Sequence, residues 1–477
     1  MTRRNFLRQA LLSGAILGEA QAFWNWDEWF KKEYRKQKQN ILLQKRELFI
    51  PKLASYRYEG EYKVFDMNIQ SALHPFFQKE MTHTYGINAS YLGETILLGV
   101  GEKVKINYSN FLNEATTMHG HGMHVPAKMD GAVHQIIHPS TTWSAVFEVK
   151  QSPATNWYHP HLMGETARQV YQGLAGLIIV ENKENTPKLP HEYGVDDIPL
   201  IIQQRRFKNN QIDYSPSRMD MMRGYIGGEL IVNGGIKPVF KAKRRFLRLR
   251  ILNGSNASMM KLQFDKIPKF YLVGGDNSLL LPEAVPLSFV FLSPAERVEI
   301  VVDLDGLQNS SLRLLDQVSA KEALQIEVDS LLEKNIFDPH HLTRLEELSF
   351  ASEQKTFRFG MRRMHFTING KTMDKDRIDE FIPLDQPQEW IVENPTRMMH
   401  NFHVHATHFR VVERNGSSAN VRAWERGYKD TVFLGPGDRV KLHIVMRDFA
   451  DPSAPYMYHC HILEHEDNGM MGQFVVI

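Results

Sequence analysis

The chain has one cysteine, Cys460, among 477 residues, so an intramolecular disulfide is excluded. It also has almost no net charge, because 57 Lys and Arg residues face 55 Asp and Glu residues, which leaves a formal charge of +2. Such a balance lacks both the basic surface that binds nucleic acid and an acidic tail. We therefore expect no nucleic-acid partner, and a function has to be inferred from individual sites.

The N-terminus contains only a short apolar run. It reads TRRNFLRQALLSGAILGEAQA, with Arg3 and Arg4 before the run and Ala20-Gln21-Ala22 after it. We interpret residues 1–22 as an export signal of the twin-arginine type, with an ordinary secretory signal as the alternative. The run is too short to span a membrane, so no stable membrane anchor is expected. Residues 23–47 are interpreted as an N-terminal spacer, with a helix at the bilayer surface as the alternative.

The rest of the chain consists of short β-branched and aromatic runs broken by Gly, Pro, Asn and Asp. Examples are KVKINYSN, GLIIVEN, RRFLRLRILNG, RVEIVVDLDG and RVKLHIVMRD. This pattern is typical of β-sandwiches, and the length favours two or three of them. A helical stretch is expected only around residues 319–349, where SAKEALQIEVDSLLEKN and HLTRLEELS are charged and leucine-spaced. We place a linker between domains there.

An internal repeat defines the domain organisation. In the first third, Asn110 ends a predicted strand and an HGH motif begins nine residues later, and in the last third Asn394 precedes an HVH motif at the same offset. Each of these thirds then contains a second motif, YHPH in one and YHCH in the other. The middle third has the strand and Asn253, but the same offset gives LQF. We therefore predict three related domains, of which the middle one lacks metal ligands.

The repeated histidine pairs predict metal sites. In a strand, alternate side chains share a face, so both rings of an HxH pair point to one side. Four such pairs occur in the repeats, at matched offsets that buried structural histidines would not explain. These eight imidazoles can converge only if the first and third domains pack face to face, and eight ligands suit three coppers. They are His119, His121, His159, His161, His403, His405, His459 and His461.

Cys460 lies between two of these histidines, so its thiol points away from them toward a different site. Nearby His400, His465 and Met470 complete a set of two imidazoles, one thiolate and one thioether. This is the ligand set of a blue-copper electron-transfer centre, and zinc fits it less well because structural zinc sites are usually cysteine-rich. A bound metal would also protect a lone exported thiol by holding it as a thiolate. One three-residue segment would then connect two metal sites.

Four motifs in order, TTMHGHG, NWYHPH, HNFHVH and HCHILEHEDNGMM, resemble those of the multicopper oxidases. The resemblance runs over nearly the whole mature chain and is to the three-domain bacterial laccase-like enzymes, which include periplasmic cuprous oxidases. It implies an all-β fold of three cupredoxin-like Greek-key β-sandwich domains. From the twin-arginine-type signal we expect a periplasmic location. The domains would span residues 48–183, 184–332 and 355–477, with a linker at 333–354.

The resemblance also implies four copper ions and a role for each ligand. His400, Cys460, His465 and Met470 would bind the type 1 copper, His119 and His403 the type 2 copper, and His121, His159, His161, His405, His459 and His461 the type 3 pair. Dioxygen would be the oxidant, and a small reductant such as Cu(I) or a phenol would supply electrons. Asp130 and Glu466 fall on family positions where a carboxylate either relays protons or only orients a ligand.

Three positions depart from the family pattern around the third motif. Asn401 replaces a proline, Ala406 replaces a glycine, and His408 stands where another polar residue is common. Since all the predicted ligands are present, we expect altered loop packing there and no loss of copper. His124 and His408 lie near ligands in the sequence, and we interpret them as surface or supporting residues.

The sequence determines the reductant least well. Met398 falls where the cuprous oxidases have a substrate methionine, and Met219 and Met221 stand in the segment SRMDMMRG. Soft thioethers bind Cu(I). Against this, the long methionine-rich insertion of those enzymes is absent, and Thr396 replaces their acidic ligand. We predict a cuprous oxidase in copper tolerance, with phenol or aromatic amine oxidation and a non-catalytic copper binder as alternatives. A copper-free scaffold, as in cell-division relatives of this fold, is disfavoured because those proteins lose the ligands and every ligand is present here.

Overall fold

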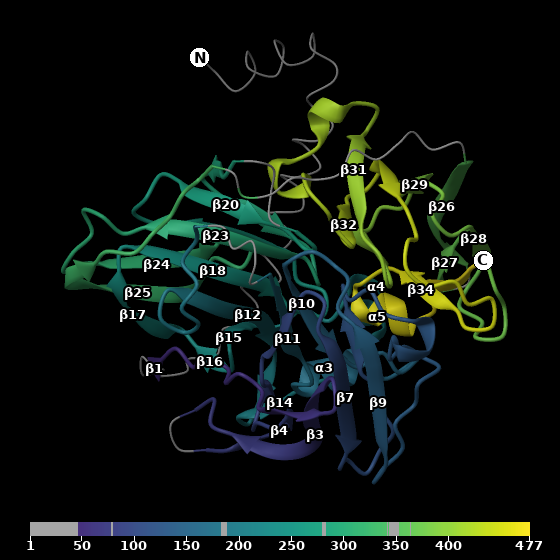
Figure 1. The fold of residues 1–477 in the computed structure, drawn as a ribbon, viewed down its shortest axis with the longest axis horizontal. Coiled ribbons are helices and arrows are strands. Elements are labelled where there is room, and N and C mark those ends of the chain that lie inside the picture. The colour runs from purple at the N-terminus through teal and green to yellow at the C-terminus, as the bar shows by residue number, and fades with distance from the viewer. Residues whose placement is uncertain are drawn as a thin grey trace.

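A computed structural model describes residues 46–77, 80–182, 188–278, 283–340, 342, 353–362 and 364–477. The predicted signal at 1–22, all but the last two residues of the spacer, and residues 343–352 of the linker lie outside the described residues. Figure 1 shows strands throughout and only short helices, which confirms the predicted all-β fold. No helix among the described residues is long and apolar enough to cross a membrane.

The first domain is built from two sheets. Their strand orders are β5-β4-β3-β7-β9, with β2 paired to β3, and β6-β11-β10-β8. The strands are β2 Tyr56–Glu59, β3 Tyr62–His74, β4 Thr82–Ile87, β5 Leu92–Gly93, β6 Ile96–Gly99, β7 Lys103–Asn110, β8 His119–His121, β9 Thr142–Glu148, β10 Ala154–His159 and β11 Gly176–Glu181. Along β7 half-buried and buried residues alternate, so one face of the strand enters the core.

The middle domain has sheets in the orders β16-β15-β12-β18-β23-β20-β21 and β1-β17-β25-β24-β19-β22, with a separate β13-β14 hairpin. Its strands are β12 Asp197–Arg205, β13 Phe207–Lys208, β14 Gln211–Ile212, β15 Glu229–Val232, β16 Gly235–Ile236, β17 Pro238–Arg244, β18 Phe246–Asn253, β19 Met260–Phe264, β20 Phe270–Gly274, β21 Val285–Leu287, β22 Val290–Leu292, β23 Arg297–Asp303, β24 Ser311–Asp316 and β25 Lys321–Glu333. The first strand of the chain, β1 Arg46–Glu47, pairs with β17, so the end of the spacer joins this domain.

The third domain has sheets in the orders β27-β26-β29-β33-β31 and β28-β35-β34-β30-β32. Its strands are β26 Glu353–Arg362, β27 His365–Ile368, β28 Glu380–Ile382, β29 Gln388–Glu393, β30 His400–Val404, β31 Phe409–Arg414, β32 Thr431–Leu434, β33 Arg439–Ile444, β34 Tyr456–His459 and β35 Met471–Val476. The described helices are α3 Thr166–Gln172, α4 Arg218–Arg223 and α5 Leu463–Asp467, with the 3-10 turns η1 Ala127–Met129, η2 Ser418–Asn420 and η3 Ala423–Glu425.

The helical stretch expected around residues 319–349 is wrong in its first half. Residues Lys321–Glu333 form β25, which pairs with β17 and β24. Leu324, Ile326 and Val328 alternate along the strand and are buried in the core of the middle domain. The charged residues suited a helix surface, but in an extended strand the alternating apolar side chains pack into the core of the domain. Residues 343–349 lie outside the described residues.

The three repeated asparagines hold equivalent loops. The Nδ2 of Asn110 donates to Glu114 O (2.8 Å), that of Asn394 to Met398 O (2.8 Å), and that of Asn253 to Ser258 O (2.8 Å). In all three, Oδ1 accepts from the backbone N–H two residues later. The asparagine therefore fixes the turn that leads to the ligand strand in the outer domains, and it keeps that role in the middle domain without ligands.

Replacing Asn253 by alanine should therefore destabilise the middle domain while leaving the metal ligands intact. The side chain is fully buried and also donates to Leu292 O (3.0 Å), so its loss leaves buried backbone groups unpaired. We expect a loss of about 1–3 kcal/mol in unfolding free energy, measured as a lower midpoint of thermal unfolding. Gln308→Ala, which removes an exposed amide of the same domain, is the control, and an equal effect of both variants would contradict this role.

Candidate metal centre

Eight histidines meet at the seam between the first and third domains. All are at most 1% exposed: His119, His121, His159, His161, His403, His405, His459 and His461. Strand pairing sets their directions, because β8 lies antiparallel to β10 with His119 opposite His159, and β30 lies antiparallel to β34 with His403 opposite His459. Alternate residues share a face of each strand, so both rings of a pair turn toward the seam.

The ring nitrogens divide six of these histidines into two triads. The triads are His161, His405 and His459, and His121, His159 and His461. In the first, Nε2 of His459 lies 3.1 Å from the Nε2 atoms of the other two, and in the second, Nε2 of His159 lies 3.4 Å from Nδ1 of His121 and from Nε2 of His461. Nitrogens that bind one ion at about 2.0–2.1 Å stand about 2.9–3.4 Å apart, so each triad fits one metal ion.

The two remaining histidines, His119 and His403, form a matched pair. The Nδ1 of His119 donates to Asp130 O (2.8 Å), and the Nδ1 of His403 donates to Asp430 O (2.9 Å). Both Nε2 atoms are buried without a hydrogen-bond partner. Since a buried lone pair without a partner is costly, two such atoms suit a third metal ion.

Cys460 lies in a separate cluster with His400 and His465. The Sγ atom is 3.5 Å from His400 Nδ1 and 3.8 Å from His465 Nδ1, and these two nitrogens are 3.1 Å apart. Met470 is fully buried beside them, and its backbone bonds to His465 O (3.0 Å) and to Cys460 N (3.1 Å). The structure therefore brings all four predicted ligands of this site together.

The donor set of this cluster fits a copper ion. Burial raises the pKa of the Cys460 thiol to about 12, so the sulfur alone would stay protonated. Burial also lowers the pKa of His465 to about 3, so this ring is neutral and has a lone pair to offer. A metal that replaces the thiol proton makes the thiolate stable, and two imidazoles with a thiolate and a thioether favour copper.

The segment His459-Cys460-His461 links the seam histidines to the Cys460 cluster. His459 belongs to one seam triad, His461 belongs to the other, and Cys460 between them turns to the separate cluster. The three residues are covalently continuous, so the sulfur is connected to both triads through a few bonds.

Comparison with known proteins agrees with this geometry. Residues 69–185 and 347–477 match family models described as multicopper oxidase. The chain is 35% identical over 441 residues to the multicopper oxidase mco of Staphylococcus haemolyticus, with 91% of this chain and 93% of that protein covered. A crystal structure of a laccase from Pediococcus acidilactici matches with a TM-score of 0.86 at 32% identity and covers 92% of this chain and 95% of that chain. The chain belongs to the multicopper oxidase family.

This multicopper oxidase also has relatives of another kind. The cell division protein FtsP of Xenorhabdus nematophila is 31% identical over 437 residues, with 86% of this chain and 88% of that protein covered. Overall sequence identity alone does not separate the oxidases from the cell division proteins. The buried histidines and Cys460 do, because their converging lone pairs would be a large cost in a chain that bound no metal.

Asp130 of this multicopper oxidase orients two of the seam histidines. Its Oδ2 accepts from Nδ1 of His405 (2.7 Å), and its Oδ1 lies 3.4 Å from Nδ1 of His119. Burial alone would raise its pKa, but His405 and His119 hold the pKa of Asp130 well below its ordinary value. An ionised carboxylate here fixes both rings with Nε2 directed inward.

Glu466 lies beside two other seam histidines. Its Oε1 is 3.5 Å from Nδ1 of His161, and its Oε2 is 3.2 Å from Nδ1 of His459. Burial raises the pKa of Glu466. The two predicted carboxylates therefore differ in character, because Glu466 holds a proton more readily than Asp130.

Sequence reasoning missed Asp430 and its partner Arg297. Asp430 Oδ1 accepts from Nε2 of His121 (2.9 Å), which leaves Nδ1 of that ring for the metal. Arg297 of the middle domain donates to both oxygens of Asp430 at 2.7 Å. Asp430 stands in the segment YKDTV, which contains none of the repeated histidine motifs that point to metal ligands.

The departure at Asn401 has a structural use. Its Nδ2 donates to Pro294 O (2.8 Å) in the middle domain, and its Oδ1 accepts from the His461 backbone N–H (2.6 Å). A proline could make neither bond. Asn401 therefore ties the Cys460 segment to the middle domain.

The three candidate substrate methionines differ in their exposure and in the segment that carries them. The Nε2 of His465 donates to Met222 O (3.1 Å), so α4 lies against the outer edge of this ring. On the same helix Met219 is 55% exposed and Met221 is half-buried. Met398 is half-buried and packs against the core of the third domain. No described contact joins a sulfur of these three residues to a ligand.

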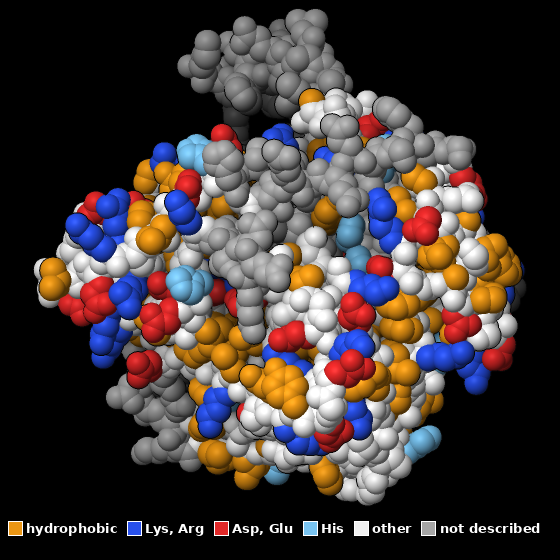
Figure 2. Space-filling view, in the orientation of Figure 1, with side chains coloured by type: hydrophobic (Ala, Val, Ile, Leu, Met, Phe, Trp, Pro, Cys, Tyr) orange, Lys and Arg blue, Asp and Glu red, His pale blue; other side chains and the backbone are white. Residues whose placement is uncertain are grey.

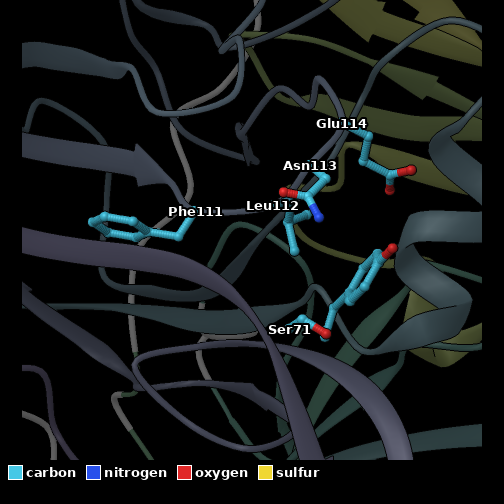
Figure 3. A pocket seen from close by; sticks show the side chains of 6 residues that line it. Ser71, Phe111, Leu112, Asn113 and Glu114 are labelled. Carbon is cyan, nitrogen blue, oxygen red and sulfur yellow. The ribbon is translucent and has the colours of Figure 1, made fainter.

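A shallow surface pocket lies apart from both clusters. It is lined by Ser71, Tyr85, Phe111, Leu112, Asn113 and Glu114 (Figure 3). None of these is a predicted ligand or substrate residue, so this pocket has no assigned part in the oxidase reaction.

Changing Cys460 to serine should remove the strong blue absorption of this multicopper oxidase. The hydroxyl is a poor copper ligand compared with a thiolate, whereas the seam histidines are unchanged. We expect the variant to lose turnover with any reductant while keeping much of its other copper, as measured by absorption and metal analysis. Ile462→Val, a small change at a buried neighbour, controls for packing. Oxygen consumption by Cys460→Ser at the wild-type rate would contradict the route through the sulfur.

Proposed function

We propose that this multicopper oxidase oxidises Cu(I) and reduces dioxygen to water, with a role in copper tolerance. Four electrons from four Cu(I) ions, together with four protons, would convert one dioxygen to two waters. Four resident coppers are proposed, one at Cys460 and three at the seam. The observation that carries this proposal is the contact of His465 with α4, a helix that contains three methionines.

The Cys460 cluster and the seam histidines would carry out different parts of the reaction. Copper bound at these sites would supply one-electron transfer at Cys460 and dioxygen reduction at the seam. Cys460 and its two histidine neighbours provide the covalent connection between the regions. Asp130 and Asp430 hold ring orientation, and Glu466 is placed to hold a proton beside His161 and His459.

Two segments that contain methionines contact the His465 ring. The backbone of Met222 accepts its Nε2–H, and Met219 is exposed on the same helix. The centroid of the Phe366 ring lies 4.1 Å from that of the His465 ring, and Met364, two residues before Phe366, is 56% exposed. Soft thioethers around an electron entry point favour Cu(I) over harder cations.

Phenol or aromatic amine oxidation is the second candidate. The likeness to a laccase favours it. Oxygen uptake by the copper-loaded protein with Cu(I), Fe(II) or a dimethoxyphenol separates these readings, and uptake with none of them would indicate a non-catalytic copper binder.

Leucine at Met398 should slow Cu(I) oxidation more than phenol oxidation, because leucine keeps the apolar volume but offers no sulfur. Met219→Leu and Met221→Leu should act in the same direction. Steady-state oxygen uptake with both substrates provides the measurement. Met81→Leu, at an exposed methionine of the first domain, is the matched control. Equal slowing with both substrates would remove the support for a Cu(I) site.

Glutamine at Glu466 should slow dioxygen reduction by about 10²-fold while copper content stays constant, since the amide cannot take up and release a proton. Glu464→Gln is the matched control, because Glu464 is also buried but bonds to Asn256 (2.9 Å) and not to a seam histidine. Oxygen uptake and metal analysis measure the effect. If Glu466→Gln and Glu464→Gln reduce dioxygen at the same rate, the proposal that Glu466 transfers protons is wrong.

The periplasm is the proposed location. The support is the paired Arg3 and Arg4 before a short apolar run and the lone thiol, which a bound copper would protect. Cell fractionation with a copy carrying Arg3→Lys and Arg4→Lys tests it, because loss of both arginines should retain the protein in the cytoplasm.

A further inference from the structure

Two histidines outside the predicted ligand set also face each other across the seam. His124 follows β8 in the first domain, and His408 follows β30 in the third. Each stands three residues after the second histidine of an HxH motif. In both loops a residue with positive φ turns the chain directly after that motif, Gly122 at 84° and Ala406 at 55°. The repeat thus places both side chains at equivalent positions.

Their spacing matches that of a ligand pair. Nε2 of His124 lies 3.2 Å from Nδ1 of His408, and the ring centroids are 4.9 Å apart. In the Cys460 cluster, the Nδ1 atoms of His400 and His465 are 3.1 Å apart, and those ring centroids are also 4.9 Å apart. Two ligands of one ion stand about 2.9–3.4 Å apart, so the separation suits a shared ion as well as a hydrogen bond between the two rings.

Neighbouring groups hold both rings in place. Asp448 Oδ2 lies 3.4 Å from Nδ1 of His124, the nitrogen that does not face His408. A carboxylate on the outer nitrogen is the usual partner of a metal-binding histidine. The ring of Tyr428 lies 3.9 Å from the ring of His408. Burial and His124 lower the pKa of His408, which keeps its lone pair available.

We propose that His124 and His408 form a further metal site, which binds a borderline divalent cation such as Zn²⁺ or Cu²⁺ between the first and third domains. His124 is 6% exposed and His408 is half-buried, so the site lies near solvent and its other ligands are water. Lys150, 3.9 Å from Asp448 Oδ1, and Arg447 beside His408 add positive charge. Two protein ligands in such surroundings give moderate affinity and a readily exchanged ion.

Zinc binding to the copper-loaded protein tests the proposal. Zn²⁺ is not redox-active and is distinguished from copper by metal analysis, and the other histidines already hold copper. After equilibrium dialysis against micromolar Zn²⁺, wild-type protein should retain about one zinc more than His124→Gln or His408→Gln. His83→Gln, at an exposed histidine of the first domain, should behave as wild type. Blue absorption in every variant shows that the fold is intact.

Two further measurements separate a metal site from a packing contact. Asp448→Asn keeps both ligands, so it should weaken zinc binding by about 10–100-fold without abolishing it. Because the ion joins two domains, Zn²⁺ should raise the thermal unfolding midpoint of wild type but not of the two histidine variants. Equal zinc retention by wild type and both variants, or no zinc on wild type, would overturn the proposal. The experiment needs no turnover, so its result is independent of the oxidase proposal.

Discussion

The structure depends on bringing eight imidazoles together in a buried seam with their nitrogens directed at one another. Burial lowers the pKa of most of these rings, for example that of His161 to about 3, so most of them are uncharged and have a lone pair to offer. Without an ion, each unpaired buried nitrogen costs about 1–3 kcal/mol. A bound copper ion would pair with these lone pairs and remove the cost. Folding therefore preorganises the nitrogens for metal binding.

The middle domain supports the seam although it supplies no ligand. Arg297 holds the carboxylate of Asp430, which orients His121, and the Pro294 carbonyl holds Asn401 beside the Cys460 segment. A further connection crosses from the third domain to the first. Asp467 accepts from Thr166 N (3.2 Å), so α5 caps the N-terminus of α3 in the other domain. The ligand strands are thus aligned by contacts among all three domains.

The surface outside the seam is unremarkable in charge. Figure 2 shows acidic and basic side chains interspersed over the described residues of one face, in keeping with the small net charge. The charge distribution on this face therefore gives no sign of a strongly charged partner. Two departures from the family pattern coincide at the His124–His408 pair. Ala406 adopts a positive φ that glycine adopts more easily, and the turn at Ala406 precedes His408, whose ring contacts His124.

The sequence by itself determined the strands, the three-fold repeat and the ligand types, because alternation and motif spacing are local properties of the chain. It failed at β25, where pairing with β17 and β24 outweighed a helical pattern. Only the tertiary structure decided which histidines share a triad, that Asp430 orients His121, and that His124 meets His408. Those relations join residues separated by up to about three hundred positions, and no local pattern encodes a distance across a domain interface.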